Sequence, residues 1–248
     1  MRGAIISDIH ANIFALEAVL ADIGKQGADF IINLGDSLYG PIAPAATFER
    51  LAALDCITLQ GNQDRDLYQA GSRSTNLPPT YTWVLEQLEP SALNWLTQLP
   101  KIAQHGQIFA CHGLPDDDSR YLLEDVESGQ PLVRSDAAIR RDIAGVTAEV
   151  IVCGHSHIPR TVWLESGQLI INPGSVGLPA YRDLLPLPHA MENYSPHARY
   201  CLLEKTAAGW LVEERRIPYP HQQAALAARD CGRPDWAYAL MTGRAVLN

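Results

Sequence analysis

The chain has 248 residues, of which 47% are hydrophobic, so it can bury a large core while being short enough for one α/β domain over residues 1–248. Lys and Arg number 19 against 28 Asp and Glu, which gives a formal net charge of −9. An acidic surface repels a nucleic-acid backbone, which argues against non-specific binding to duplex nucleic acid.

The cysteine pattern and the first residues indicate a cytoplasmic protein. The five cysteines are odd in number, and the first four fall in or beside apolar runs, as expected for buried, reduced thiols: Cys56, Cys111, Cys153, Cys201 and Cys231. The start of the chain enters an apolar strand directly and leaves no room for a signal peptide. No run of about 18 uncharged apolar residues could span a bilayer, so we expect no membrane partner. The oligomeric state has no signal in the sequence.

A strand, a polar turn and a helix open the chain. The first apolar run predicts a buried strand, which delivers Asp8 and His10 at its carboxyl end. Asn12 then caps a helix with apolar residues three and four apart, and Gly24 and Gly27 end it. Open α/β sheets place ligand sites at the carboxyl ends of strands, although an Asp that merely caps the helix is an ordinary alternative.

The same plan recurs along the chain. Residues 30–34 predict a second strand followed by Asp36, and residues 56–59 predict a third, followed by a polar turn with Asn62, Gln63 and Asp64. A helix that begins at a proline lies between them. Strands and helices in this order give a parallel sheet with right-handed crossovers.

Histidines follow two further predicted strands. Residues 107–111 end in His112, and a strand from residue 151 ends in a glycine that precedes His155 and His157. In an extended backbone, side chains two apart point to the same side, which would direct both of the last imidazoles toward one ligand. Histidines in turns are more often hydrogen-bonded loop residues, so this stretch alone is a weak signal.

The remaining segments predict short helices, hairpins and two long excursions. Residues 81–99 predict two helices, residues 135–145 one more, and residues 161–171 and 199–213 two hairpins, before closing helices near 222–229 and 235–241. Residues 114–133 are expected to be a solvated excursion, and residues 178–198 a long loop. Because both leave the framework after candidate site residues, we expect them to set substrate choice through side chains such as Tyr181, Arg182 and His189.

The polar residues collected at strand ends form a mixed set of carboxylate, amide and imidazole ligands: Asp8, His10, Asp36, Asn62, His112, His155 and His157. Such a set suits two divalent cations of Mn, Fe, Zn, Co or Ni better than Mg or Ca. Any one member could be coincidental, but the whole series in register is very unlikely to be.

These residues resemble the calcineurin-like metallophosphoesterase superfamily through five motifs: Asp8-Ile9-His10, Gly35-Asp36, Gly61-Asn62-Gln63-Asp64, His112-Gly113 and Gly154-His155-Ser156-His157. The chain is most similar to the small bacterial and archaeal phosphodiesterases, which share the run from Asn172 to Gly177. The resemblance implies an α/β fold, a four-layer α/β/β/α sandwich of two mixed β-sheets flanked by helices.

The resemblance also implies roles. Asp8, His10 and His157 would bind one metal ion, Asn62, His112 and His155 the other, and Asp36 would bridge them. A hydroxide between the two ions would then attack phosphorus. The resemblance therefore predicts a metal-dependent phosphoesterase, and a phosphodiesterase is the leading hypothesis. The implied catalytic set is Asp36, Asn62, Gln63, Asp64 and His112. The expected substrate is a small or nucleotide-like phosphate ester.

One position departs from the superfamily pattern. Most members have His where this chain has Gln63, and a glutamine cannot act as a general acid near neutral pH. Asp64 is expected to remain available to orient a neighbour. The departure argues against a phosphoprotein phosphatase more than against hydrolysis. A phosphomonoesterase or protein phosphatase stays an alternative, as does a non-catalytic metal-binding scaffold on the same fold.

Overall fold

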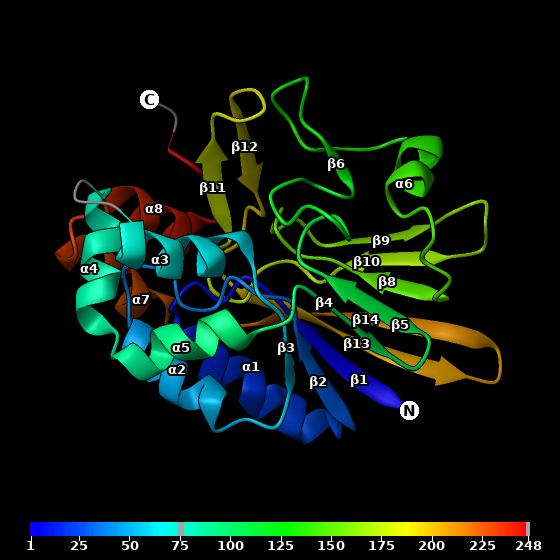
Figure 1. Ribbon diagram of the computed structural model, residues 1–248, viewed down its shortest axis with the longest axis horizontal. Coiled ribbons are helices and arrows are strands. Elements are labelled where there is room, and N and C mark those ends of the chain that lie inside the picture. Colours follow the sequence, from blue (N-terminus) through cyan, green and yellow to red (C-terminus); the bar gives the residue numbers. More distant parts are fainter. Residues whose placement is uncertain (74–76, 247–248) are drawn as a thin grey trace.

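Two five-stranded sheets pack face to face between helices in the computed structural model, which describes residues 1–73 and 77–246 (Figure 1). The first sheet contains, in spatial order, β14 (Gly209–Ile217), β13 (Ala198–Thr206), β1 (Arg2–Ile6), β2 (Phe30–Asn33) and β3 (Ile57–Thr58). The second contains β4 (Ile102–His105), β5 (Ile108–Cys111), β8 (Val150–Val152), β10 (Leu169–Asn172) and β9 (Arg160–Trp163). Both sheets are mixed: in the first, the parallel strands β1, β2 and β3 adjoin the antiparallel β13 and β14 on one side, and in the second, the parallel strands β5, β8 and β10 have an antiparallel neighbour on each side.

Alternation along the strands sorts side chains between the layers. Ile5 of β1 and Val152 of β8 meet in the core between the two sheets, whereas Ile6 faces the opposite way and packs under the helices that cover the first sheet. Ile151 of β8 points to the outer face of the second sheet, where Ile139 covers it. Side chains that alternate between the two faces of each strand thus form three apolar layers, although the strand sequences are continuously hydrophobic.

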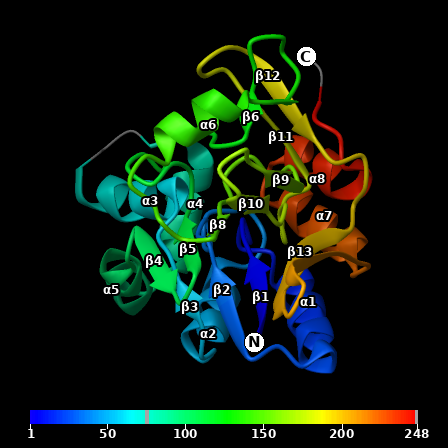
Figure 2. The ribbon, with the colours of Figure 1, turned by 90° about the vertical axis from the view of Figure 1, so that its right-hand side faces the viewer.

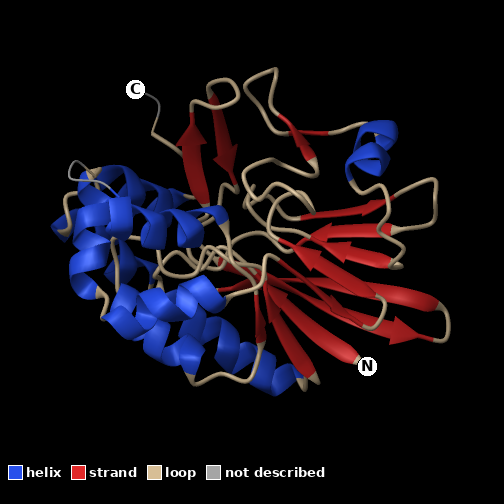
Figure 3. Cartoon of the chain, viewed as in Figure 1, coloured by secondary structure: helices blue, strands red, loops and turns tan. Residues whose placement is uncertain are grey.

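Helices cover the two outer faces unequally (Figure 3). Most lie on the side of the first sheet: α1 (Ile13–Gln26), α2 (Pro44–Ala52), α3 (Asn62–Arg73), α4 (Pro79–Gln87), α5 (Pro90–Gln98), α7 (His221–Asp230) and α8 (Pro234–Thr242). The outer face of the second sheet is covered by α6 (Asp136–Asp142). This arrangement confirms the predicted four-layer sandwich. None of the described helices is long and apolar enough to cross a membrane.

The first helix begins where the sequence predicted and ends later. The Asn12 side chain accepts a hydrogen bond from the Ala15 backbone N–H at 3.2 Å, as an N-cap should. The helix continues through Gly24 and ends at Gly27, which has a left-handed φ of 67°. The expectation that Gly24 also ends the helix was wrong, because an interior glycine only weakens a helix whereas a left-handed residue terminates it.

The two excursions are more ordered than predicted. Residues 178–198 contain the hairpin β11 (Ala180–Asp183) and β12 (His189–Glu192) in place of a continuous loop. Residues 114–133 contain the short strands β6 (Glu124–Asp125) and β7 (Leu132–Val133), and Leu122 and Leu123 pack into the outer core of the second sheet. The expectation of a wholly solvated segment was therefore wrong, because its apolar residues are buried beside α6.

The cysteines are free, and three of them are buried: Cys111, Cys153 and Cys201. Cys56 and Cys231 are partly exposed, so the prediction of burial was wrong for Cys56. Burial raises the pKa of the Cys111 thiol to about 12, which keeps it protonated and unreactive at neutral pH.

The close approach of Gly177 to the turn after β1 makes a testable prediction. Its N–H donates to the Asp8 carbonyl at 3.0 Å, and an added Cβ would collide with the Ile9 carbonyl, a backbone group that cannot move aside. We expect Gly177→Ala to lower the free energy of unfolding by about 2 kcal/mol or more. Gly24→Ala is the matched control, since Gly24 lies in a helix with nothing near its Cβ position, and should raise stability by ~0.5–1 kcal/mol. Urea unfolding of both variants tests this, and equal effects would contradict it.

Candidate functional site

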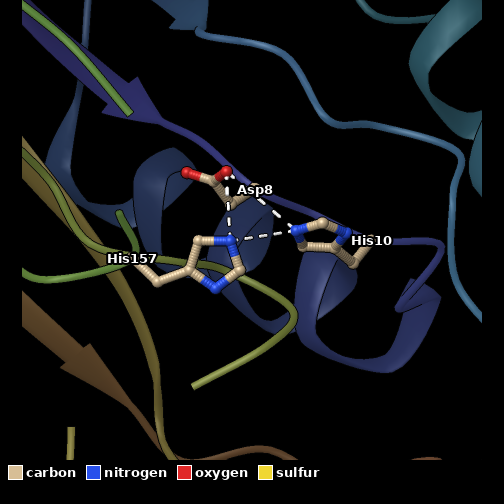
Figure 4. Close-up of side chains that lie close together, drawn as sticks. All are labelled: Asp8, His10 and His157. Carbon is tan, nitrogen blue, oxygen red and sulfur yellow. Dashed lines mark hydrogen bonds and ion pairs between the residues drawn. The ribbon is translucent and has the colours of Figure 1, made fainter. Parts of the chain in front are cut away.

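Three buried side chains from two different sheets converge at the first cluster (Figure 4). Asp8 and His10 lie in the turn after β1, and His157 lies in the turn after β8. The His157 Nε2 is 3.0 Å from the His10 Nε2 and 3.2 Å from the Asp8 Oδ1, and the His10 Nε2 is 4.0 Å from that same oxygen. The turn of each sheet therefore completes a site that neither sheet could form alone.

Hydrogen bonds fix the protonation of these rings. The His10 Nδ1 donates to the Tyr39 carbonyl at 3.0 Å, and the His157 Nδ1 donates to the Leu178 carbonyl at 2.7 Å. A carbonyl oxygen only accepts, so each neutral ring carries its proton on Nδ1 and its lone pair on Nε2. Two lone pairs then face each other beside a carboxylate oxygen, Asp8 Oδ1, which has no hydrogen-bond partner among the described residues. These atoms fit a bound cation, which would satisfy all three.

A second cluster lies beside the first and consists of Asp36, His112 and His155. The His112 Nδ1 donates to the Leu34 carbonyl at 2.9 Å, so this ring is oriented in the same manner as His10 and His157. Its Nε2 is 3.5 Å from the Asp36 Oδ2 and 3.1 Å from the Asn62 Oδ1. The amide oxygen of Asn62 thus joins the carboxylate and imidazole groups of this cluster.

Helix α3 begins at the second cluster, in the stretch that the sequence predicted to be a polar turn. Its Gln63 N–H donates to the Asp36 Oδ1 at 2.9 Å, so the positive end of the helix stabilises this carboxylate. Asp64 reaches back to the Gly61 N–H and also accepts from the backbone of Ser37. The expectation that Asp64 is available to orient a neighbour was wrong, because its carboxylate is buried and holds the turn that carries Asp36.

Burial and neighbouring charges shift the pKa values of three histidines. Burial lowers the pKa of His10 to about 4, with His157 lowering it further, and burial with the charge of His112 lowers the pKa of His155 to about 4. Burial would also lower the pKa of His112, but Asp36 outweighs it and raises this pKa to about 10. A cation that binds between His112 and Asp36 would therefore displace a proton, so its affinity should rise with pH.

The backbone at the clusters is left-handed at five positions: Asp8, His10, Asp36, His155 and His157, with φ between 51° and 67°. The prediction that His155 and His157 project toward one ligand assumed an extended backbone, and it was wrong. Left-handed residues break the alternation of a strand, so the two rings diverge into separate clusters.

A cavity of about 680 Å³ opens onto both clusters. Its lining includes the cluster residues and their neighbours: His10, Asp36, Asn62, Gln63, His155 and His157. The lining also includes Tyr181 and Arg182, as the sequence suggested, together with Tyr39, Arg233 and Trp236, which it did not. No local motif marks the last three, since their role comes from where α8 packs. The cavity lining does not include His189, whose Nε2 bonds the Tyr121 hydroxyl instead.

Comparison with known proteins agrees with this geometry. The sequence model described as the calcineurin-like phosphoesterase superfamily domain matches residues 1–185. The chain belongs to the calcineurin-like phosphoesterase superfamily. It is 30% identical over 190 residues to phosphodiesterase YfcE of Escherichia coli K12, covering 72% of this chain and 81% of that protein. Family membership makes the chain a phosphoesterase, which is a hydrolase.

Two further relatives match nearly the whole chain. A protein of Methanocaldococcus jannaschii is 26% identical over 247 residues, covering 94% of both chains. The crystal structure of a metallophosphoesterase from Sphaerobacter thermophilus superposes with a TM-score of 0.75 and 26% identity, covering 97% of this chain and 98% of that one. The similarity therefore extends through the C-terminal helices.

A buried ion pair supports the turn that carries His155 and His157. The Arg160 Nε donates to the Glu124 Oε1 at 3.0 Å, and Glu124 also bonds Ser156, which lies between the two histidines. Ser156 Oγ in turn accepts from the Asn172 side chain at 3.0 Å. The first excursion thus reaches under the site through Glu124, which is 4% exposed.

Glu124 predicts a pH dependence of stability. Burial raises the pKa of Glu124 to about 7, against the lowering effects of Ser156 and Arg160, from an ordinary value of 4.5. A raised pKa means that its contribution to stability is fully present below pH 4.5 and is lost as the pH rises through about 7. The free energy of unfolding of the native protein, relative to Glu124→Gln, should fall by about 3 kcal/mol across this window.

Chemical denaturation at several pH values measures this difference. Glu127→Gln, an exposed glutamate of the same excursion, is the control and should follow the native protein at every pH. A constant difference between the native protein and Glu124→Gln from pH 4.5 to 8 would contradict the assignment.

Proposed function

We propose that this phosphoesterase hydrolyses a phosphodiester and that its two clusters each hold one divalent cation. The observation that carries the proposal is the pair of Nε2 lone pairs, on His10 and His157, that face each other at 3.0 Å beside the unpartnered Asp8 Oδ1. The phosphodiesterase name of the E. coli relative supports the diester. The mixed nitrogen and oxygen donors favour Mn, Fe, Zn, Co or Ni.

Each residue has a role in this proposal. Asp8, His10 and His157 hold the first cation, and Asn62, His112 and His155 hold the second. We assign Asp36 as the bridge because its carboxylate belongs to the second cluster while its backbone carbonyl accepts from the His10 N–H at 2.9 Å, which places it beside the first. Two such cations supply a nucleophile at neutral pH and positive charge against the charge that develops on the phosphoryl oxygens.

Replacing the bridge tests the two-cation arrangement. Asp36→Ala removes a ligand from both ions, so we expect the bound metal to fall from two ions to none and the activity with it. Asp66→Ala is the control, because Asp66 is another carboxylate close by on α3, outside both clusters, and it pairs with Arg65 at the surface. Elemental analysis after dialysis measures the occupancy. Two tightly held ions in Asp36→Ala would rule out the bridging role.

Gln63 predicts how the rate depends on the leaving group. Gln63 lines the cavity but cannot donate a proton, so the leaving oxygen departs with most of its charge. We expect fast hydrolysis of aryl esters such as bis(p-nitrophenyl) phosphate and a steep fall in rate as the leaving-group pKa rises. General acid catalysis contributes ~10²–10⁴-fold, and Gln63→His should recover part of this for alkyl esters. The recovery should be incomplete, because Asp64 is held by backbone groups and cannot orient the new ring.

A series of diesters with graded leaving groups measures the slope in both proteins. Gln63→Asn is the control, since it shortens the side chain without adding an acid. A shallow slope in the native protein would show that another group already protonates the leaving oxygen. No hydrolysis of any ester with both ions bound would favour a non-catalytic scaffold.

A further inference from the structure

Residues outside the two clusters form the rest of the cavity lining, which we call the far wall. It combines β11 with α8 and the residues around them, and the two segments pack together (Figure 2). The family model matches residues 1–185, so α8 lies outside the matched part. A cavity of about 680 Å³ has room for a drug-sized molecule, which is far larger than a phosphate group. The cavity therefore has room for an organic group beside the phosphate.

Aromatic rings form the part of this wall that adjoins the metal ligands. The Trp236 ring lies edge-on to His10, with centroids 5.6 Å apart, and 6.2 Å from the Tyr39 ring. The Arg233 guanidinium lies over Trp236 at 5.4 Å from the ring centre. This apolar surface next to His10 suits a ring-bearing group attached to the phosphate under attack.

Four charged side chains line the far wall, and three of them are engaged by the protein itself. Arg233 donates two hydrogen bonds to Asp235, at 2.9 Å and 2.6 Å, so these charges cancel. The Asp183 carboxylate accepts from the backbone N–H groups of Leu184 and Leu185, which hold it against the tip of the hairpin. Arg233 and Asp235 therefore present no net charge to a ligand, whereas Asp183 keeps its negative charge and has its carboxylate bound by backbone N–H groups.

Arg182 is the cation of this wall that forms no ion pair with the described residues. It lies on β11, is exposed, and lines the cavity. Its Nη1 donates to the Val246 carbonyl at 3.3 Å, and no carboxylate pairs with it in the part of the chain that the structure describes. A guanidinium has five N–H donors, so most of them remain free to bind an anion, and their planar geometry matches a phosphate.

We propose that the substrate is a nucleotide-like phosphodiester that carries a second phosphate, which Arg182 binds while the ring lies against Trp236 and Tyr39. This inference rests on the proposed phosphodiester hydrolysis and names the class of ester that the site accepts. The second phosphate is thus held by Arg182, which belongs to neither cation cluster. Arg182 is therefore a specificity-determining residue, and the reaction at phosphorus does not need it.

Equilibrium binding separates this inference from catalysis. Thymidine 3′,5′-bisphosphate and thymidine 5′-phosphate share the ring and differ by the second phosphate. Calorimetry on the metal-loaded protein should show that the bisphosphate binds about tenfold tighter or more, as expected of a charge-assisted contact. Arg182→Gln should reduce this ratio to within about threefold. Arg182→Lys should keep part of it, since the charge remains, and Arg216→Gln, an exposed arginine outside the cavity lining, should leave it unchanged.

A kinetic comparison uses the same pair as esters. The p-nitrophenyl ester of thymidine 5′-phosphate should be hydrolysed at equal rates by the native protein and Arg182→Gln, whereas the ester with an added 3′-phosphate should lose kcat/KM in the variant. Equal binding of both nucleotides by the native protein, or a ratio unaffected by Arg182→Gln, would overturn the inference. Binding contrast without hydrolysis of either ester would overturn the proposed function and leave the assignment of Arg182 supported.

Discussion

Three backbone carbonyls determine how the site is built. Those of Tyr39, Leu178 and Leu34 each accept the Nδ1 proton of one histidine, and this directs the Nε2 atoms of His10, His157 and His112 into the site. Without these acceptors a ring could rotate or change tautomer, and its Nε2 would no longer face the other members of its cluster. The sandwich supplies these carbonyls at fixed positions, because Leu34 follows a strand of one sheet and Leu178 follows a strand of the other.

The site lies across the two sheets, so it depends on their packing. Asp8, His10 and Asp36 come from turns of the first sheet, whereas His112, His155 and His157 follow strands of the second. The core between the sheets, where Ile5 and Val152 meet, sets the distance between these two sets of turns. Interiors are packed closely and resist small displacements, which is how a hydrophobic core holds polar ligands at contact distance.

Much of the fold and most of the site followed from the sequence because both depend on local patterns. Apolar strands that end in polar residues gave the sheets, and the cap at Asn12 gave the first helix. The turn after β8 was misjudged because its left-handed backbone depends on neighbours from the other sheet. The hairpin in residues 178–198 was missed because prolines at its tip mask the strand pattern. Trp236 and Arg233 carry no local signal, and only the packing of α8 brings them to the cavity.

The left-handed backbone of Asp8, His10, Asp36, His155 and His157 has an evolutionary consequence. This region costs a residue with a side chain about 1–2 kcal/mol, while glycine adopts it freely. In a lineage that no longer needs the chemistry, glycine at these positions would remove this backbone cost, although at Asp8 and Asp36 it would also remove a carboxylate that accepts from a backbone N–H. A descendant that kept the fold only as a binding surface is expected to have glycine or asparagine at these positions. This chain has aspartate or histidine at all five.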